Sequence, residues 1–508
     1  VVVVKKDNSQ QKRLVAYVRV RGNEDAAMIR REAAKVLPKH MMPSAFMVLK
    51  EFPLTQNGKI NKRALPEPEL DMGSGYRYVP PRTEKEKVLA AIWEQVLKAD
   101  TVGIHDNFFE LGGDSILSIQ IISRTKLAGL HLTTKQIFEN QTIEELADVA
   151  SEVETPILAE QGLVVGEVAL SPIEHWFFDH AFANEHHWNQ SVLLDIRPSA
   201  KLNDQQISRA LASVVLQHDA LRLRFEHNGD AVRQFHFENA DGASHFVMHT
   251  VDLCEAPDTG LAAAITERCT AIQASLDLHK GPLLAAGYFK LPEGRRKLLL
   301  VIHHLVVDGV SWRILLDDFT QALNKIVQHD DVALGLKTTS YQQWVNALAD
   351  YVTSGALNAE MTHWERTVSG DKPVLPLDDP EGSFTVADTL VHSLKLGEEQ
   401  TTALLRDVNR AYRTEINDVL MTALARTFSD WSGNVETLLD LEGHGREMFS
   451  DKIDLSRTVG WFTSVYPVRL RYENGQSLQD NLKSIKEQLR QIPSRGFGFG
   501  ALRYLGND

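Results

Sequence analysis

The sequence predicts a multidomain protein with three parts: a small α+β segment, a helical bundle and a large α/β domain. With 508 residues and 43% hydrophobic content, the chain is too long for one ordinary core. Two linkers interrupt it, a Pro- and Gly-rich one at 66–81 and a weaker one at 152–166. We therefore expect domains at residues 1–66, 83–152 and 166–508.

Charge and cysteine content exclude several classes of protein. The chain has 54 basic and 68 acidic residues, a net charge of −14, which argues against nucleic acid as a partner and offers no basic patch to an anionic membrane. Its two cysteines are too few for a disulfide framework. The opening valine run is far shorter than a signal peptide core or a membrane span. We expect a cytoplasmic protein whose chain begins inside a domain.

The first part pairs two strand-like apolar runs with one helical pattern, at 14–20, 45–48 and 26–36. In the stretch 54–63, Asn57-Gly58 favours a tight turn that presents Lys59, which alone is typical of a surface hairpin. The stretch resembles the last motif of the C-terminal subdomain of amino-acid adenylation domains. The resemblance implies that Lys59 reaches the acyl-adenylate during activation. Without the large subdomain, this part is expected to adenylate nothing alone.

The second part has the pattern of a helical bundle. Apolar residues recur at helical spacing over 88–97, after a capping box formed by Thr83 and Glu86. A second capping box, Thr142 with Glu145, opens the last predicted helix.

A glycine-rich approach to a serine lies between these helices. The stretch 106–115 ends in Gly112-Gly113-Asp114-Ser115 and is followed by a helical apolar run. The glycines leave Ser115 accessible, and a helix N-terminus there offers unpaired N–H groups to a phosphate. An ordinary helix cap is the alternative on these residues alone. A nucleotide-binding P-loop is disfavoured because no lysine follows the glycines.

The second part is similar to peptidyl carrier domains along its full length. The resemblance implies a four-helix carrier bundle in which Ser115 bears covalent 4'-phosphopantetheine. The thiol of that group would hold an aminoacyl or peptidyl thioester as the substrate. A phosphopantetheinyl transferase is then an implied partner.

The third part alternates strand-like and helical patterns, which predicts an α/β domain. An apolar run at 298–302 delivers His303 and His304 to a strand end, where adjacent side chains point to opposite faces, so only one enters a given cleft. Asp308, four residues after His304, could fix a tautomer or anchor the loop by pairing with an arginine. We expect no metal in this motif, because adjacent strand histidines diverge and no third ligand cluster is evident.

The third part resembles the condensation and epimerization superfamily of nonribosomal peptide synthetases. Besides 303–312, further runs match the motifs of the family in order, at 170–177, 416–420, 441–447, 457–467 and 493–500. Trp312 follows Ser311, the order of the epimerization branch. The resemblance implies a two-lobed, chloramphenicol-acetyltransferase-like domain with a tunnel between the lobes.

Epimerization removes an α-proton and returns one to the opposite face, which requires acid/base groups. The family implies that His304 and Glu442 face each other across the tunnel, and which of them is base or acid stays open. Asp308 and Arg446 complete the candidate catalytic set. Arg446 would lower the pKa of a Glu442 carboxyl that a dry cleft raises. We assign His303 to structure.

Three functions compete on this evidence. The leading one is epimerization of the thioester carried by Ser115, which gives an L/D mixture and feeds a downstream condensation domain. The second is peptide-bond formation by a condensation domain. The third is a carrier beside a catalytically inert docking lobe. The family continues to an Asn-Tyr motif that this chain, ending at 506–508, does not supply. We expect a C-terminally truncated fragment of a larger synthetase.

Overall fold

A computed structural model provides the structure of the chain. The structure describes residues 2–6, 12–19, 43, 45–49, 52–53, 60, 65, 78–97, 99–109, 111–113, 115–133, 136–137, 140–152, 159–197, 202–229, 231–382, 385–408, 412, 414–447, 449–450 and 452–506. The chain divides into two compact units, residues 1–155 and 156–508.

The first unit begins with a three-stranded sheet. Its strands are β1 (Val2–Lys6), β2 (Lys12–Val18) and β3 (Ala45–Val48). In the order β1-β2-β3, β1 runs antiparallel and β3 parallel to β2. Tyr17 is fully buried and packs with Leu65 in a small core. β2 and β3 confirm the two expected strands, whereas the helix expected at 26–36 and the turn with Lys59 lie outside the described residues.

A helical bundle follows in the same unit. Its elements are α2 (Glu84–Leu97), α3 (Ser115–Leu127), α5 (Ile143–Val149), β4 (Leu130–His131) and β5 (Ser151–Glu152). The rings of Trp93 and Phe108 pack 5.4 Å apart in an apolar core to which all three helices contribute. Part of the stretch 133–140 lies outside the described residues, so the fourth helix of the bundle stays a prediction.

The two capping boxes begin their helices in different ways. The Glu86 N–H donates to Thr83 Oγ1 at 3.1 Å, and the Thr83 N–H donates to Glu86 Oε2 at 2.9 Å, which is the expected reciprocal pair. The Glu145 N–H donates to Thr142 Oγ1 at 3.3 Å. The Glu145 carboxylate accepts from the Gln141 N–H at 3.0 Å, one residue earlier than the standard box would have it.

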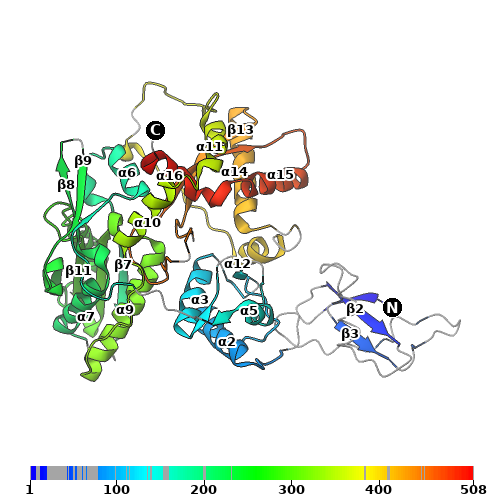
Figure 1. The fold of residues 1–508 in the computed structure, drawn as a ribbon, viewed down its shortest axis with the longest axis horizontal. Coiled ribbons are helices and arrows are strands. Elements are labelled where there is room, and N and C mark those ends of the chain that lie inside the picture. The colour runs from blue at the N-terminus through cyan, green and yellow to red at the C-terminus, as the bar shows by residue number, and fades with distance from the viewer. Residues whose placement is uncertain are drawn as a thin grey trace. The chain divides into compact units, whose positions relative to one another are not determined.

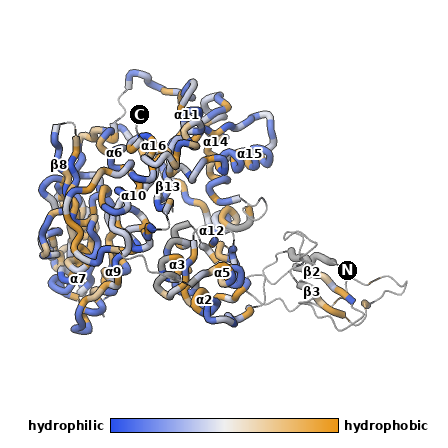
Figure 2. The backbone as a smooth tube through the Cα atoms, in the orientation of Figure 1, coloured by the Kyte–Doolittle hydropathy of each residue, from blue (hydrophilic) through white to orange (hydrophobic). Residues whose placement is uncertain are grey.

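The second unit contains a four-stranded sheet with the order β10-β11-β12-β7 (Figure 1). Its strands are β7 (Asn189–Ile196), β10 (Phe246–Asp252), β11 (Leu284–Lys290) and β12 (Arg296–His303). β10 and β11 are parallel, and the other neighbours are antiparallel. The helices α7 (Asp204–Gln217) and α8 (Asp258–Gln273) pack on it, and α9 (Gly309–Gln328) packs on α7. Phe289, Leu299 and Val301 share one face and pack against α8. The strands carry the orange, hydrophobic stretches of Figure 2.

A second group of elements surrounds the antiparallel pair β13 (Glu436–Gly443) and β14 (Ser464–Arg471). Its helices are α11 (Met361–Val368), α14 (Ile416–Ser432), α15 (Leu478–Arg490) and α16 (Phe497–Leu505). Trp364, Tyr466 and Ile485 are buried in its core. The remaining elements are α6 (Pro172–Asp179), α10 (Tyr341–Thr353), α12 (Glu398–Thr402) and the sheet β6-β9-β8, formed by β6 (Glu167–Val168), β9 (Ala231–His236) and β8 (Leu223–Asn228). α16 packs on both α6 and α10.

Two strand ends place the sequence motifs of the third part. β12 is buried from Leu298 to its last residue, His303, as its continuous apolar run predicts. β13 ends at Gly443. The motifs at 303–312 and 441–447 therefore begin where two strands of the same unit finish.

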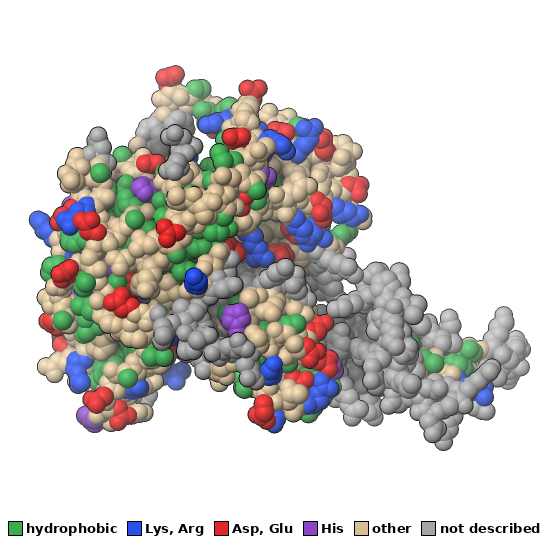
Figure 3. Space-filling model, viewed as in Figure 1, with side chains coloured by type: hydrophobic (Ala, Val, Ile, Leu, Met, Phe, Trp, Pro, Cys, Tyr) green, Lys and Arg blue, Asp and Glu red, His purple; other side chains and the backbone are tan. Residues whose placement is uncertain are grey.

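Acidic and basic side chains alternate over the described surface visible in Figure 3. Among the residues that the structure describes, no helix combines the length and the apolar character needed to cross a membrane.

Candidate active site

A cavity of about 270 Å³ in the second unit brings two of the four candidate catalytic residues together. Its lining residues are Ile173, Trp176, His187, Trp188, Asn189, His304, Glu442, Trp461 and Val465. His304 reaches the cavity from the end of β12, and Glu442 reaches it from β13. An imidazole and a carboxylate thus share one cavity, which is what two-sided proton transfer requires.

His304 is held by its backbone and by the packing of its ring. Its N–H donates to the carbonyl of Trp188 at 2.8 Å, and its ring lies 4.4 Å from that of Trp461. Burial lowers the pKa of His304 from 6.5, and the charges of Asp308 and Glu442 oppose that shift. His304 is therefore neutral at pH 7, the form that accepts a proton.

Gln190 determines which nitrogen of His304 carries the proton. The Trp312 indole Nε1, which can only donate, lies 2.8 Å from Gln190 Oε1. This contact fixes the amide, so Gln190 Nε2 faces His304 Nε2 at 2.8 Å as a donor. The hydrogen-bond network thus assigns the proton of neutral His304 to Nδ1, and the lone pair of Nε2 accepts the hydrogen bond from Gln190.

Glu442 lies on the more open side of the cavity. It pairs with Val465 in the β13–β14 ladder, and its side chain is exposed to solvent. The dry surroundings expected for this carboxylate are therefore not found, and its protons can exchange directly with water.

His303 points away from this cavity, as strand alternation predicts. Its Nε2 donates to the carbonyl of Glu185 at 2.8 Å, and its Nδ1 accepts from the Leu305 N–H at 3.2 Å. Burial lowers the pKa of His303 to about 3. The ring is a neutral structural element with both nitrogens occupied.

Asp308 and Arg446 form a buried ion pair outside the cavity lining. Arg446 Nη2 lies 3.1 and 3.2 Å from the two carboxylate oxygens of Asp308. Asp308 also caps α9 by accepting from the Ser311 N–H at 2.7 Å. Of the two roles that the sequence left open for Asp308, the geometry matches the anchoring of the loop by an arginine. Arg446 is committed to Asp308, and the structure does not bring it to the cavity with Glu442.

Further hydrogen bonds engage both terminal nitrogens of Arg446, whereas its buried Nε has no hydrogen-bond partner among the described residues. Its Nη1 donates to the carbonyls of Leu455 and Thr458, at 3.1 and 2.8 Å. Its Nη2 also donates to Ser311 Oγ at 2.9 Å, and the guanidinium lies 3.9 Å from the ring centroid of Phe462. This pair is a closed structural unit.

Sequence reasoning missed Gln190 and the aromatic wall of the cavity. Trp461 and Trp176 each belong to a run that matches a family motif, but the sequence assigned no role to either. Gln190 is the second residue of β7, and the sequence around it does not identify it as a functional residue. Only its register opposite Ile302 on β12 brings it beside His304.

A second cavity, of about 420 Å³, adjoins the first. The two have Ile173, Trp176 and Val465 in common as lining residues. The larger one extends between β13, β14 and α16, where Leu439, Phe497 and other apolar residues line it. It extends the space beside His304 and Glu442.

The backbone around Ser115 fits an attachment site for a phosphate-linked arm. Ser115 is the first residue of α3. Gly112 has a φ of +93°, a backbone conformation that glycine adopts without strain, and nothing lies within 4 Å of a Cβ added there. A Cβ on Gly113 would lie 2.4 Å from the Phe108 ring, so only glycine fits. Lys59 lies outside the described residues.

Family models match nearly the whole chain. Residues 164–508 match the condensation domain, residues 87–150 the phosphopantetheine attachment site, and residues 1–59 the C-terminal domain of AMP-binding enzymes. A linear gramicidin synthase of Brevibacillus parabrevis is 46% identical over 511 residues, a match that covers 100% of this chain but 6% of the relative. Chondramide synthase of Chondromyces crocatus is 42% identical over 487 residues, 94% of this chain and 12% of the relative.

Two solved structures are similar to the second unit. The epimerization domain from the third module of tyrocidine synthetase B is 38% identical, with a TM-score of 0.64, over 69% of this chain and 77% of that one. The first condensation domain of the calcium-dependent antibiotic synthetase, in complex with a substrate analogue, is 19% identical, with a TM-score of 0.53, over 67% and 78%. The latter likeness concerns the fold alone.

Proposed function

Because the chain belongs to the condensation-domain family and joins that domain to a carrier domain as nonribosomal peptide synthetases do, we propose that it epimerizes the α-carbon of an aminoacyl or peptidyl thioester tethered to its own Ser115. The observation that carries the proposal is the cavity that His304 and Glu442 line together. The chloramphenicol-acetyltransferase-like fold of the superfamily supplies the frame.

Two observations favour epimerization over peptide-bond formation. The similarity to the solved epimerization domain, at 38% identity, is twice that to the solved condensation domain, at 19%. The Trp312 indole, placed after Ser311 as in the epimerization branch, holds Gln190 and through it the ring of His304. The feature that distinguishes the two branches in sequence thus acts directly on the proposed base.

The match to the phosphopantetheine attachment model shows that the carrier bundle bears covalent 4'-phosphopantetheine. We assign its attachment to Ser115 at the start of α3. The arm supplies a thiol that holds the acyl group as a thioester, whose carbonyl acidifies the α-proton. A phosphopantetheinyl transferase and a downstream condensation domain are the partners that follow from this proposal.

In the proposed mechanism, the Gln190 N–H first releases the lone pair of His304 Nε2, and Nε2 then accepts the α-proton. The C–H bond breaks, its electron pair moves onto the substrate carbonyl oxygen, and the proton forms an N–H bond on the imidazole. The neutral state of the ring, maintained by burial and by the Gln190 amide, prepares it to act as base. Trp461, packed against the ring, keeps it in this orientation.

Glu442 returns a proton to the opposite face of the α-carbon. Its carboxyl O–H bond breaks as the new C–H bond forms, and the electron pair leaves the carbonyl oxygen. The cycle closes when the carboxylate regains a proton from water and the imidazolium loses one, which the exposure of Glu442 allows. Because the same two groups also run the reverse reaction, we expect an L/D mixture.

The test loads Ser115 from a panel of L-aminoacyl and, separately, D-aminoacyl coenzyme A thioesters, using a phosphopantetheinyl transferase, in deuterated water. Mass spectrometry then follows α-deuterium, and chiral chromatography follows the released amino acid. We expect exchange and a mixture from either enantiomer. His304→Ala and Glu442→Gln should each slow exchange by about 10²- to 10⁴-fold, the usual contribution of a positioned acid or base.

The same experiment separates the other functions. A condensation domain would make a dipeptide thioester from an added acceptor carrier, without deuterium incorporation. An inert lobe would leave a loaded carrier with no exchange. Exchange that survives in the double variant would refute the assignment of His304 and Glu442, and loading of Ser115→Ala would refute the attachment site.

A further inference from the structure

We propose that Glu185, His227 and His279 form a binding site for a divalent zinc ion, on the outer side of the segment that forms one wall of the active-site cavity. This inference does not depend on the proposed epimerization. The three residues come from separate segments, so no local motif indicates a metal site here.

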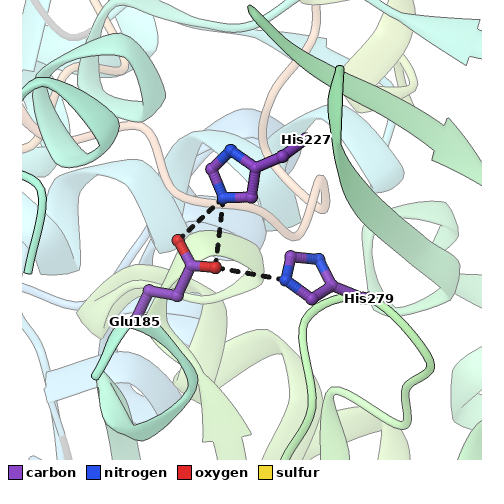
Figure 4. Close-up of side chains that lie close together, drawn as sticks. All are labelled: Glu185, His227 and His279. Atoms are coloured by element: carbon purple, nitrogen blue, oxygen red, sulfur yellow. Dashed lines mark hydrogen bonds and ion pairs between the residues drawn. The ribbon is translucent and has the colours of Figure 1, made fainter. Parts of the chain in front are cut away.

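The three side chains converge on one point (Figure 4). Glu185 begins the short helix Glu185–His187, His227 lies near the end of β8, and His279 lies in the turn before β11. Each offers one ligand atom, and these atoms all lie within 4.8 Å of one another. Among the described residues, this is the one such group of three.

The distances between the ligand atoms fit a shared ion. His227 Nε2 lies 3.1 Å from both carboxylate oxygens of Glu185, and His279 Nε2 lies 3.2 Å from Oε1. Ligands bound tetrahedrally at about 2.0–2.1 Å from zinc lie roughly 3.3 Å from one another. The two histidine nitrogens lie within 4.8 Å of each other, so an ion bound between the three side chains would draw them together.

His279 is already oriented as a metal ligand. Its Nδ1 lies 2.7 Å from the carbonyl of Phe225, which can only accept, so Nδ1 is the donor. A neutral His279 therefore directs the lone pair of Nε2 at Glu185 Oε1, itself a lone-pair atom, and a cation between them relieves that contact. A backbone carbonyl behind a ligating imidazole is the usual outer partner in metal sites.

The ligand set and its exposure point to zinc. Two imidazoles and one carboxylate with a fourth position left for water is an established zinc coordination. The side chains of His227, His279 and Glu185 are 48%, 36% and 22% exposed, so both an ion and a water molecule have access. The alternative is an ion-pair cluster without metal, which a metal titration distinguishes.

Bound zinc would stabilise the position of the segment that forms one wall of the active-site cavity. The backbone carbonyl of Glu185 accepts the hydrogen bond from His303, the neighbour of His304. Two residues further on, His187, Trp188 and Asn189 line the cavity. Zinc would tie this segment to β8 and to the turn before β11, and so would act as a positioning element without touching the substrate.

The test titrates metal-free full-length chain with Zn²⁺ against a chelating dye of micromolar affinity. Competition is needed because the chain has 19 histidines, and weak binding to isolated ones is expected. We expect one tight equivalent per chain, a rise in the melting temperature on binding, and a visible absorption band with Co²⁺ in place of Zn²⁺.

Variants decide the result. His227→Ala and Glu185→Gln should each weaken binding at least about 100-fold, the upper end of what even an outer partner contributes. Both leave backbone contacts intact, and circular dichroism checks the fold. His392→Ala, which removes an exposed histidine elsewhere, is the matched control and should bind like the parent. Absence of a tight equivalent, or equal binding by all four proteins, would overturn the site.

Discussion

The motifs at 303–312 and 441–447 contribute two acid/base pairs to the molecule, and the two pairs have opposite surroundings. Asp308 and Arg446 are buried and bonded to each other. His304 and Glu442 both line a cavity of about 270 Å³. Residue type and spacing are alike in both cases. What distinguishes the buried pair from the pair that we propose to be reactive is how many hydrogen bonds its side chains make within the protein.

This contrast shows how a fold can leave some polar side chains available for chemistry while it uses others for structure. Asp308 accepts from Arg446 and from the N–H groups of Ser311 and Phe462, so it has no capacity left for a substrate. In His304, by contrast, Nε2 is contacted by a single amide, that of Gln190, and the ring packs against Trp461. We expect substitutions in the first pair to change stability and those in the second to change rate.

The largest effect should come from breaking the closed pair. Arg446→Leu leaves Asp308 as a buried, unpaired charge, which should lower the free energy of unfolding by about 3–5 kcal/mol. Glu442→Gln, on the exposed side of the cavity, should change it by no more than about 0.5 kcal/mol. Urea unfolding followed by tryptophan fluorescence measures this, because every tryptophan except Trp93 lies within residues 156–508.

A second substitution serves as the control for that prediction. Asp308→Asn removes the stranded charge and retains an acceptor for the Ser311 N–H, so adding it to Arg446→Leu should restore part of the lost stability. Equal stability of Arg446→Leu and Glu442→Gln would contradict the distinction between the two pairs.

Glu174 is a buried acid for which no cationic partner is found among the described residues, and it can be compared with Asp308, which pairs with Arg446. Glu174 accepts from the Ser171 N–H at 2.7 Å and from Gln234 at 3.0 Å, and burial raises its pKa from 4.5 to about 7. Its stabilising contribution is present below pH 4.5 and is lost as the pH rises to about 7, a difference on the order of 3 kcal/mol.

Glu174→Gln removes this titration. The variant should be more stable than the parent at pH 8, with the advantage disappearing by pH 4.5, as thermal melting across that range would show. Asp308→Asn, which removes a carboxylate held by an arginine, should show no such gain at pH 8. A Glu174→Gln melting curve that follows the parent at every pH would contradict the raised pKa.

The smallest predicted effect comes from substitutions of Gln190, which contacts His304 of the His304–Glu442 pair. Gln190→Glu keeps an acceptor for Trp312 but presents an anion to His304 Nε2, which should raise the pKa of His304 by at least about one unit. The acidic limb of the deuterium-exchange profile, expected below pH 6.5, should move up accordingly. Gln190→Ala should slow exchange about tenfold, with a smaller shift.

A purely structural role for Gln190 would give a different result. Both variants would then lower the rate without moving the acidic limb, and the Trp312 contact retained by Gln190→Glu would rescue most of the activity. The pH profile therefore separates positioning of the base from general support of the strand.

The family resemblance of the sequence predicted that His304 and Glu442 line one cavity, but it did not predict the surroundings of either residue. The alternation of β12 was enough to separate His303 from His304, and the order of motifs placed Glu442 in the same domain. The partner of Asp308 was left as one of two possibilities, and burial decided it. Gln190 and the convergence of Glu185, His227 and His279 depend on strand register and on turns from distant segments, which local patterns do not encode.

The hydroxyl of Ser311 has a consequence for engineering. It donates to the carbonyl of Gly460 and accepts from the N–H of the same residue, at 2.9 and 3.1 Å. A chimaera of related synthetases should therefore take 303–312 and 441–461 from a single parent. A crossover between these segments would separate Ser311 from the Gly460 backbone with which it is hydrogen-bonded.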